Sequence, residues 1–596
     1  MTAEQTAFNF IRKSIFLDIP FFQRPYVWEK DDWDSLLDTL VDGLDNKSSI
    51  FLGSIILKEQ PSEDTGVKSY QVIDGQQRLT TLSILVKACY DSDEELQSDQ
   101  DARVNLAQIL FTKLGSKKKK LIKINHSRVD VEDYENIVHG NFTSIKDKST
   151  NLCRCYTYFK NELSAKDSST REAIWDILVM NETNLLVKIE LGENDNEQAI
   201  FDSINSAGVR LTCFDTIKNT LFQRAYQLAQ TEEDKEEILN VYDYHWAKVF
   251  ENPDDLEGIK FWQQSKSSGR LERDNKELLL NAVASINGFY NPNTHKMVEL
   301  TNKYKVYMNG ITQLTVLLDF IKEIADYAIV YRKKFTGFNK ATLHSYKDDE
   351  KRLLQILEEL GVYTFHAYLL KLFKEQPDNL VAELKLIEKF VLRHYLCGVS
   401  AKNFNKETAV VFKDGGTMAK LWESKESYIN DKQVKASLKS LHRTQNKVPT
   451  LILFWIELKR RSEDSKTDIT ALAYTYSLEH IMPKKWEDHW GTDNPPVMND
   501  GRRVTNQEEA KEIRDAAVYQ IGNATLLKKS LNSKIKNDEF TKKMKGSSSR
   551  SKGIKEYGEL FVTKEVIDIY DKGRPWDEDE INLRTERLTE EFFKIW

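Results

Sequence analysis

Glycine and proline are scarce in this chain, and their scarcity limits the folds that are open to it. The 596 residues include only 24 Gly and 11 Pro. Because these two residues dominate tight turns and the short connections of all-β proteins, the chain has few of the signals that a β-sandwich needs. A single hydrophobic core does not extend over this length, so we expect two to four domains. The predicted fold class is α+β with helix dominant.

Cysteine usage and hydropathy indicate the compartment. The five Cys residues show neither a zinc-ligand spacing nor a disulfide framework. No stretch approaches the roughly 18 apolar residues of a membrane span, and residues 1–10 lack the apolar segment of a signal peptide. We therefore expect a reduced, cytoplasmic protein with no membrane contact.

The most direct chemical signal lies near the C-terminus. Residues 477–483 read SLEHIMP, residues 522–527 read GNATLL, and Asn532 follows soon after. A His has a pKa near neutrality and can take the proton of an attacking water. Carboxylate and amide oxygens suit Mg²⁺ better than Zn²⁺, and an Asn carbonyl can hold the other ring nitrogen of a His.

One carboxylate, one His and two Asn in this order are typical of a one-metal phosphodiester nuclease. We assign catalytic roles to His480 and Asn523, and metal binding to Glu479 and Asn532. Taken singly, each Asn also fits an ordinary turn. Adjacent residues on a strand point to opposite faces, so Glu479 and His480 serve one site only if the backbone bends there. Pro483 is consistent with a strand that ends nearby.

These residues resemble the HNH, or ββα-metal, nucleases, and above all the C-terminal domain of the GmrSD-type modification-dependent (type IV) restriction enzymes. The family signature is an acidic residue and His, then I-x-P, then G-N-x-T-L-L, then Asn. It is matched here by Glu479-His480, Ile481, Pro483, Gly522-Asn523, Thr525-Leu526-Leu527 and Asn532. The chain departs from the family at Lys484-Lys485, where a small polar residue or Gln is usual. The resemblance implies an HNH domain that uses Mg²⁺ or Mn²⁺.

A basic segment overlaps this motif. The whole chain has a net charge of −7, yet residues 524–555 contain ten Lys or Arg and only two acids. Such a cluster supplies sequence-independent affinity for nucleic acid phosphates, although a solvated surface is the alternative. We expect contacts to double-stranded DNA from Lys528, Lys529, Lys534, Lys536, Lys542 and Lys543.

A second candidate site lies near the N-terminus. Residues 70–73 read as a strand that runs into Asp74-Gly75-Gln76-Gln77-Arg78, where a helix begins. The N–H groups of a helix start attract anions, and an Arg adds a bidentate phosphate donor. Asp-Gly before a helix is also a common cap, so the pattern alone leaves both interpretations open.

Residues 22–28 (FQRPYVW) and 51–57 (FLGSIIL) extend the pattern, and together the three segments resemble the N-terminal domain of the same enzymes. That domain is similar to the ParB/sulfiredoxin fold, and its D-G-Q-Q-R segment belongs to a nucleoside triphosphate-hydrolysing site. The resemblance implies nucleotide binding by Gln23, Arg24, Tyr26, Asp74, Gly75, Gln76, Gln77 and Arg78. Residues 197–222 resemble a further family segment that includes Asp215, although these residues also suit helix caps.

The predicted domains are a ParB-like α/β nucleotide-binding domain (1–224), a helical linker domain (225–465) and a ββα-metal nuclease domain (466–596). The resemblance implies a nucleotide-dependent endonuclease of antiphage defence that acts on modified DNA. One alternative is a nucleotide-hydrolysing switch that binds DNA and regulates a partner without cutting. Another is a ParB-like DNA-binding adaptor with no activity. The sequence leaves the oligomeric state open, with a homo-oligomer as one option.

Overall fold

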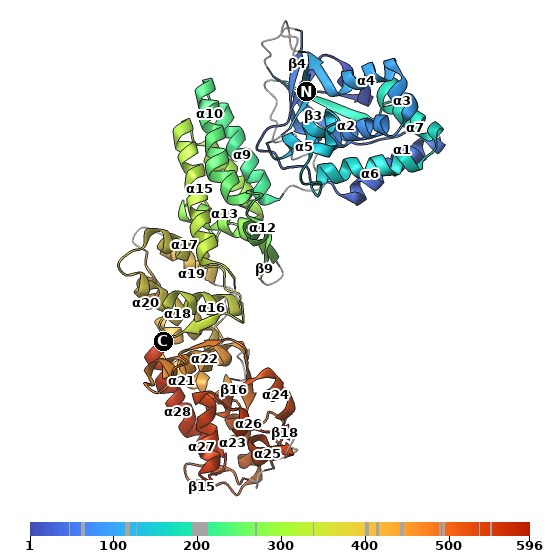
Figure 1. Cartoon of the computed structure of the whole chain (residues 1–596). Coiled ribbons are helices and arrows are strands. Elements are labelled where there is room, and N and C mark those ends of the chain that lie inside the picture. The colour runs from blue at the N-terminus through green and yellow to red at the C-terminus, as the bar shows by residue number, and fades with distance from the viewer. Residues whose placement is uncertain are drawn as a thin grey trace. The chain divides into compact units, whose positions relative to one another are not determined.

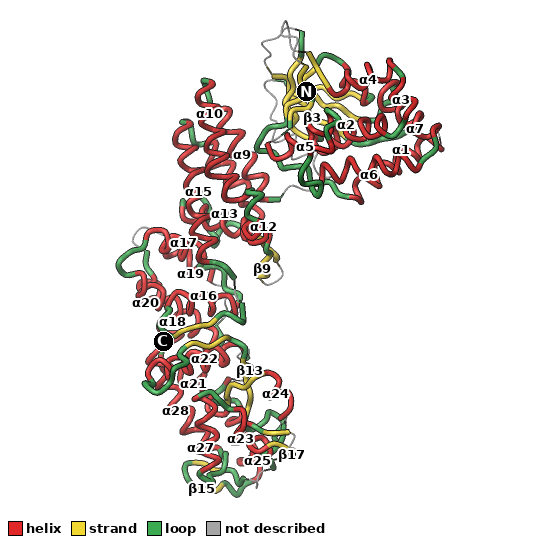
Figure 2. Tube along the Cα trace, viewed as in Figure 1, coloured by secondary structure: helices red, strands yellow, loops and turns green. Residues whose placement is uncertain are grey.

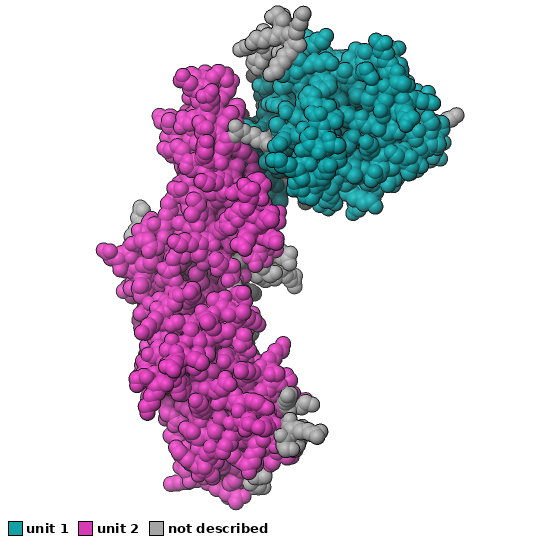
Figure 3. All heavy atoms as spheres, in the orientation of Figure 1, with its two compact units in different colours: residues 1–223 teal, residues 224–596 magenta. Residues whose placement is uncertain are grey.

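The chain forms two compact units that consist mostly of helices. The computed structural model describes residues 1–46, 48–60, 66–113, 120–126, 128–192, 212–268, 271–337, 339–399, 404–412, 416–441, 446–487, 490–491, 495–535, 537–548 and 551–596. The units are residues 1–223 and 224–596, coloured separately in Figure 3. Helices account for 61% and strands for 12% of the structure. Figure 2 shows where helices and strands lie along the chain. The predicted helix-dominated α+β class is confirmed.

A mixed sheet organises the first unit. Its strand order is β1-β8-β3-β4-β2-β7. The strands are β1 (Thr2–Thr6), β2 (Ile15–Asp18), β3 (Ser54–Gln60), β4 (Lys68–Asp74), β7 (Ile124–Asn125) and β8 (Leu186–Leu191). β4 runs parallel to β2 and antiparallel to β3, and β3 runs parallel to β8. The strand predicted at residues 70–73 is confirmed within β4.

Packing on both faces of the sheet and around α2 holds the start of α2 in place. Ile55 and Leu57 of β3 pack into the main core, whereas Ile56 between them joins a small cluster with Ile189 and Leu191. This alternation is that of a strand covered on both faces. The helices are α1 (Lys30–Asn46), α2 (Gln76–Asp91), α3 (Glu94–Ser98), α4 (Gln100–Leu110), α5 (Arg128–Val138), α6 (Asn151–Ala165) and α7 (Ser168–Trp175). The next helix, α9 (Cys213–Leu228), begins in the first unit and ends in the second. α2 contacts α4, α5, α6 and α7 and is buried over most of its length (Figure 1).

The second unit begins with a succession of helices. They are α10 (Glu232–Val241), α11 (Lys248–Phe250), α12 (Leu256–Gln263), α13 (Asn275–Ile286), α14 (Leu300–Asn309), α15 (Leu314–Lys334), α16 (Asp349–Leu360), α17 (His366–Glu375), α18 (Leu380–Leu396), α19 (Phe404–Val411), α20 (Met418–Ile429), α21 (Asp431–Leu438) and α22 (Lys447–Glu463). A short ladder joins β11 (Leu343–Ser345) to β12 (Ala471–Ala473). Within the ranges given above, no helix has the length and apolar character needed to cross a membrane.

The C-terminal part of this unit is built around two paired strands. β13 (Tyr476–His480) pairs antiparallel with β16 (Ala524–Lys528), and α24 (Lys529–Ile535) contacts both strands. The remaining elements are β14 (Met498–Asn499), β15 (Arg502–Arg503), α23 (Gln507–Val518), α25 (Phe540–Lys545), β17 (Gly546–Ser548), β18 (Ser551–Lys552), α26 (Ile554–Tyr557), α27 (Phe561–Asp571) and α28 (Glu578–Ile595).

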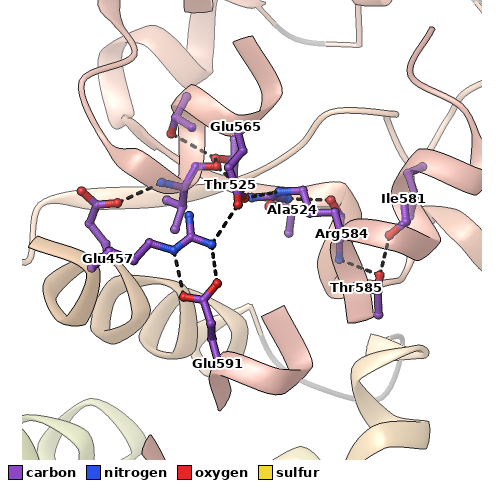
Figure 4. A network of polar contacts seen from close by, with 12 residues as sticks. Glu457, Ala524, Thr525, Glu565, Ile581, Arg584, Thr585 and Glu591 are labelled. Atoms are coloured by element: carbon purple, nitrogen blue, oxygen red, sulfur yellow. Dashed lines mark hydrogen bonds and ion pairs between the residues drawn. The ribbon is translucent and has the colours of Figure 1, made fainter. Parts of the chain in front are cut away.

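A buried polar network holds β16 against α22, α27 and α28 (Figure 4). The guanidinium of Arg584 is fully buried and donates to the carbonyl oxygens of Gly522 and Ala524, both at 2.6 Å. It also pairs with Glu565 at 3.0 Å, and Arg460 bridges Glu565 to Glu591. Because each charge has a partner, the network positions the start of β16 without leaving an unpaired buried ion.

Gly522 allows the close approach of α28 to this strand. Its N–H donates to Thr585 Oγ1 at 3.0 Å, and a methyl group at this position would overlap the carbonyl oxygen of Ile581 and the hydroxyl of Thr585. We therefore expect Gly522→Ala to destabilise the second unit by about 1–3 kcal/mol, the usual cost of overpacking. Urea denaturation of the full chain measures this loss. A loss below about 0.5 kcal/mol would contradict the close packing.

Candidate active site

The pairing of β13 with β16 unites the two halves of the C-terminal motif. Glu479 stands opposite Thr525, and His480 opposite Ala524. One residue beyond the ladder, the N–H of Ile481 donates to the carbonyl oxygen of Asn523 at 2.9 Å. β16 leads directly into α24, which carries Asn532. The segments that contain Glu479, His480, Asn523 and Asn532 therefore lie together.

Asn532 is tied to β13 by its amide nitrogen. Nδ2 donates to the carbonyl oxygen of Leu478 at 2.9 Å and to Ser477 Oγ at 3.0 Å. Its carbonyl oxygen, Oδ1, makes no hydrogen bond with any described residue. The side chain is half-buried. The amide is thus oriented by its nitrogen, and its oxygen remains able to accept a ligand.

Glu479 forms a buried ion pair. The side chain of Lys543 on α25 is 0% exposed, and its Nζ lies 2.5 Å from Glu479 Oε1 and 2.8 Å from the carbonyl oxygen of His480. Burial raises the pKa of Glu479 above its ordinary value, although the Lys543 charge opposes this shift. The second carboxylate oxygen, Oε2, makes no polar contact within the described part of the chain. The prediction that Lys543 contacts DNA is corrected, because the side chain is enclosed.

The imidazole of His480 remains neutral. Burial, together with the charges of Lys484 and Lys543, lowers the pKa of His480 to about 4. Its ring nitrogens make no hydrogen bond to the residues that the structure describes. A neutral imidazole with an open acceptor nitrogen has the form that a proton-accepting base requires.

The side-chain amide of Asn523 makes four hydrogen bonds, and none of them is to the ring of His480. Its Nδ2 donates to the carbonyl oxygens of Met482 and Val518, at 2.8 and 3.0 Å. Its Oδ1 accepts from the N–H of Met482 and from the indole of Trp576, at 2.8 and 3.0 Å. An amide has two donors and two acceptor sites, so no capacity is left for the His480 ring. An Asn carbonyl that holds the ring of His480 is therefore not that of Asn523, whose amide fixes the backbone just after His480.

In the N-terminal unit, Asp74 and Gly75 join β4 to α2. Gly75 has φ +90°, and a Cβ there would lie 2.7 Å from Ile55, so both conformation and space require glycine. Asp74 accepts the N–H of Gly75, and burial raises the pKa of Asp74 while Arg78 and Arg24 oppose the shift. Asp74 therefore lies at the start of a buried helix beside two guanidinium groups.

Arg24 and Arg78 are partly buried cations near that carboxylate. Arg78 Nη1 donates to the carbonyl oxygen of Ser54 at 2.5 Å, and its guanidinium lies so close to Gly53 that a Cβ there would be 2.7 Å away. Burial lowers the pKa of Arg24, and the charges of Asp215 and Asp74 raise it. Two guanidinium groups beside the carboxylates of Asp74 and Asp215 suit a phosphate ligand with a bound metal cation.

The family of the chain follows from comparison with known domains. Residues 5–222 match the N-terminal domain of GmrSD restriction endonucleases, and residues 424–591 match the C-terminal domain of the same enzymes. The chain belongs to the GmrSD restriction endonuclease family. No curated protein matches it. The C-terminal match begins upstream of the predicted boundary at residue 466 and takes in α22, which contacts β13 and β16.

Several residues predicted to bind nucleotide brace the N-terminal GmrSD domain. Gln23 donates to Val72 O at 2.7 Å, Gln76 donates to Arg24 O at 3.1 Å, and Gln77 bonds to Pro25 O and to the N–H of Val27. These bonds tie the loop at residues 20–28 to β4 and α2.

Tyr26 also belongs to the interior. Its side chain is buried, and its hydroxyl lies 2.6 Å from Thr81 Oγ1 and accepts the indole N–H of Trp33 at 2.9 Å. Tyr26 lines a small cavity together with Arg24, Gln76 and Gln77, and its contact with nucleotide stays a prediction. Phe201, Asn205, Gly208 and Leu211 of the further family segment lie outside the described residues.

The six lysines predicted to contact DNA differ in solvent exposure. Lys528, Lys529 and Lys542 are exposed, and Lys528 lies 3.6 Å from Glu559. Lys536 and the side chain of Lys534 lie outside the described residues. Three of the six lysines predicted to contact DNA are therefore exposed.

Sequence reasoning missed the pairing of Lys543 with Glu479. Phe540, Lys543 and Met544 are the buried residues of α25, at spacing i, i+3, i+4. That spacing marks one helix face, and it was the available signal that this lysine differs from its neighbours. Among the described residues, no group of three or more His, Cys, Asp or Glu gathers as a metal site. A cation bound at this site would take Glu479 with amide and substrate oxygens.

The two Asn residues of the motif should contribute differently to the stability of the second unit. Asn523→Ala removes four buried hydrogen bonds, so we expect it to destabilise the second unit by at least about 3 kcal/mol. Asn532→Ala removes two bonds from a half-buried side chain, and its expected cost is about 1 kcal/mol. Urea denaturation of both variants of the full chain gives the comparison. Equal losses would contradict the assigned role of Asn523.

Proposed function

We propose that this chain is a nucleotide-dependent endonuclease of antiphage defence that cuts or nicks modified double-stranded DNA by metal-assisted phosphodiester hydrolysis. The observation that carries the proposal is the convergence of Glu479, His480 and Asn532 on β13 and α24, in a chain with both GmrSD domains. Two antiparallel strands followed by a helix that contacts both form the ββα arrangement that an HNH site uses. This topology supports assignment of the C-terminal part as an HNH domain.

Each side chain at the site has a role in this proposal. The neutral imidazole of His480 accepts the proton of the attacking water. Glu479 Oε2 and Asn532 Oδ1 are hard oxygen donors, and they fit Mg²⁺ or Mn²⁺. When bound, such a cation neutralises charge on the scissile phosphate and the leaving oxygen. Asn523 keeps the backbone after His480 in place, and the exposed lysines Lys528, Lys529 and Lys542 hold the DNA backbone.

The N-terminal unit supplies the nucleotide dependence. The start of α2 offers N–H groups to an anion, and Arg24 and Arg78 supply positive charge for a triphosphate. Asp74 is the residue placed to orient a cation or a water. The mixed sheet of this unit is consistent with the ParB/sulfiredoxin-like fold that the family resemblance implies. Exposed lysines hold DNA without choosing sequence, so a requirement for nucleotide and for modified DNA protects the host genome.

His480→Ala is expected to reduce DNA cleavage by about 10²–10⁴-fold, because the base is removed. The assay is cleavage of a panel of modified phage DNAs with Mg²⁺ and each NTP. His139→Ala, an exposed His in the first unit, is the matched control and should cut normally. Normal cutting by a folded His480→Ala protein would refute the proposal. Nucleotide hydrolysis without any cutting by the wild type would favour the switch protein instead.

Asp74→Asn keeps the size of the side chain and removes its charge. We expect NTP hydrolysis to fall at least about tenfold, and modified-DNA cutting to fall with it, because the carboxylate that orients cation or water is lost. Release of inorganic phosphate measures the first effect. Asp133→Asn, at a position in α5, is the control. Unchanged hydrolysis by Asp74→Asn would exclude Asp74 from the nucleotide site.

A further inference from the structure

Lys543 links the two residues that are central to the proposed cutting reaction. Its Nζ contacts the carboxylate of Glu479 at 2.5 Å and the backbone carbonyl oxygen of His480 at 2.8 Å. The lysine comes from α25 and both partners come from β13, so the contact joins elements that are far apart in sequence. The ammonium is enclosed, and therefore it acts on β13 and not on solvent.

This ion pair opposes the binding of a divalent cation. One ammonium already neutralises the single charge of Glu479. A cation on Oε2 of the same carboxylate would lie close to that ammonium, and like charges repel strongly where water is excluded. Within the described part of the chain, Glu479 belongs to no group of three or more His, Cys, Asp or Glu residues. The Glu479–Lys543 pair by itself carries no net charge that would attract a metal ion.

A DNA phosphate at the site changes the balance of charge around Glu479 and Lys543. Each phosphodiester carries one negative charge, and a scissile phosphate must lie next to His480 and Glu479 for the reaction to occur. Its charge compensates the ammonium, so the cation and the phosphate favour each other's binding. Such coupling is reciprocal: DNA must tighten metal binding by the same factor by which metal tightens DNA binding.

We propose that Lys543 is a positioning residue that makes metal loading conditional on DNA, by holding Glu479 in a neutral ion pair until a phosphate enters. The inference rests on the proposed metal-assisted cutting at Glu479 and Asn532. It gives the nuclease site a local restraint, separate from any control by nucleotide. If Lys543 had only a structural role, its removal would disorder Glu479 and weaken metal binding. The metal affinity would then change in the opposite direction.

The test measures Mn²⁺ binding by calorimetry to the full chain, with and without a short DNA duplex. All proteins carry His480→Ala, so that the duplex is not cut. Lys543→Met is compared with Lys545→Met, an exposed lysine on the same helix. Without DNA, Lys543→Met should bind Mn²⁺ at least about tenfold more tightly than the parent, and Lys545→Met should match the parent. The duplex should tighten Mn²⁺ binding to the parent at least about tenfold, and to Lys543→Met far less.

Two more variants separate charge from packing. Lys543→Gln keeps an N–H donor for Glu479 without the charge, and it should behave like Lys543→Met even if the latter folds poorly. Lys543→Arg keeps the charge and should restore the dependence on DNA. Glu479→Gln should abolish Mn²⁺ binding in every background, which shows that the measured ion sits at this carboxylate.

The possible results distinguish the inference from the function on which it rests. Mn²⁺ binding by Lys543→Met and Lys543→Gln that is no tighter than that of the parent overturns the inference. Tight binding by the parent without DNA also overturns it, and leaves metal-assisted cutting intact. If no protein binds Mn²⁺ even with DNA, both the inference and the metal-assisted function fail.

Discussion

The antiparallel pairing of β13 with β16 is the constraint on which the candidate nuclease site depends. It aligns Glu479 and His480 with the start of β16 and leads into α24, where Asn532 is anchored to Leu478. The pairing is itself held by Arg584 beneath Gly522 and Ala524, and by the saturated amide of Asn523. The polar site is thus supported by a second layer of buried polar contacts.

The N-terminal unit places its polar residues by the same principle. α2 is buried along most of its length, so the turn at Asp74 and Gly75 cannot shift without disturbing the core. Gln23, Gln76 and Gln77 fasten the neighbouring loop by bonds to backbone atoms. In both units, then, candidate site residues such as His480 and Asp74 lie at the ends of strands that are packed against other elements, which keeps their geometry fixed.

The sequence predicted the elements better than it predicted the contacts. The dominance of helix, the strand before Asp74 and the family all follow from composition, apolar runs and motif order. The burial of Lys543, the saturation of the Asn523 amide and the enclosure of Tyr26 do not. Each depends on a partner far away in the sequence, such as Glu479, Trp576 or Trp33 and Thr81. A motif names the residue types of a site, whereas tertiary packing decides which of them face a ligand.

In the proposed cutting reaction, Glu479 Oε2 and Asn532 Oδ1 jointly hold the cation. Anomalous diffraction at the manganese edge, from crystals of the full-chain His480→Ala protein with a DNA duplex and Mn²⁺, tests this claim directly. We expect an Mn²⁺ peak in contact with both oxygens and with a DNA phosphate. An Mn²⁺ ion on the DNA phosphate that touches neither oxygen would contradict it.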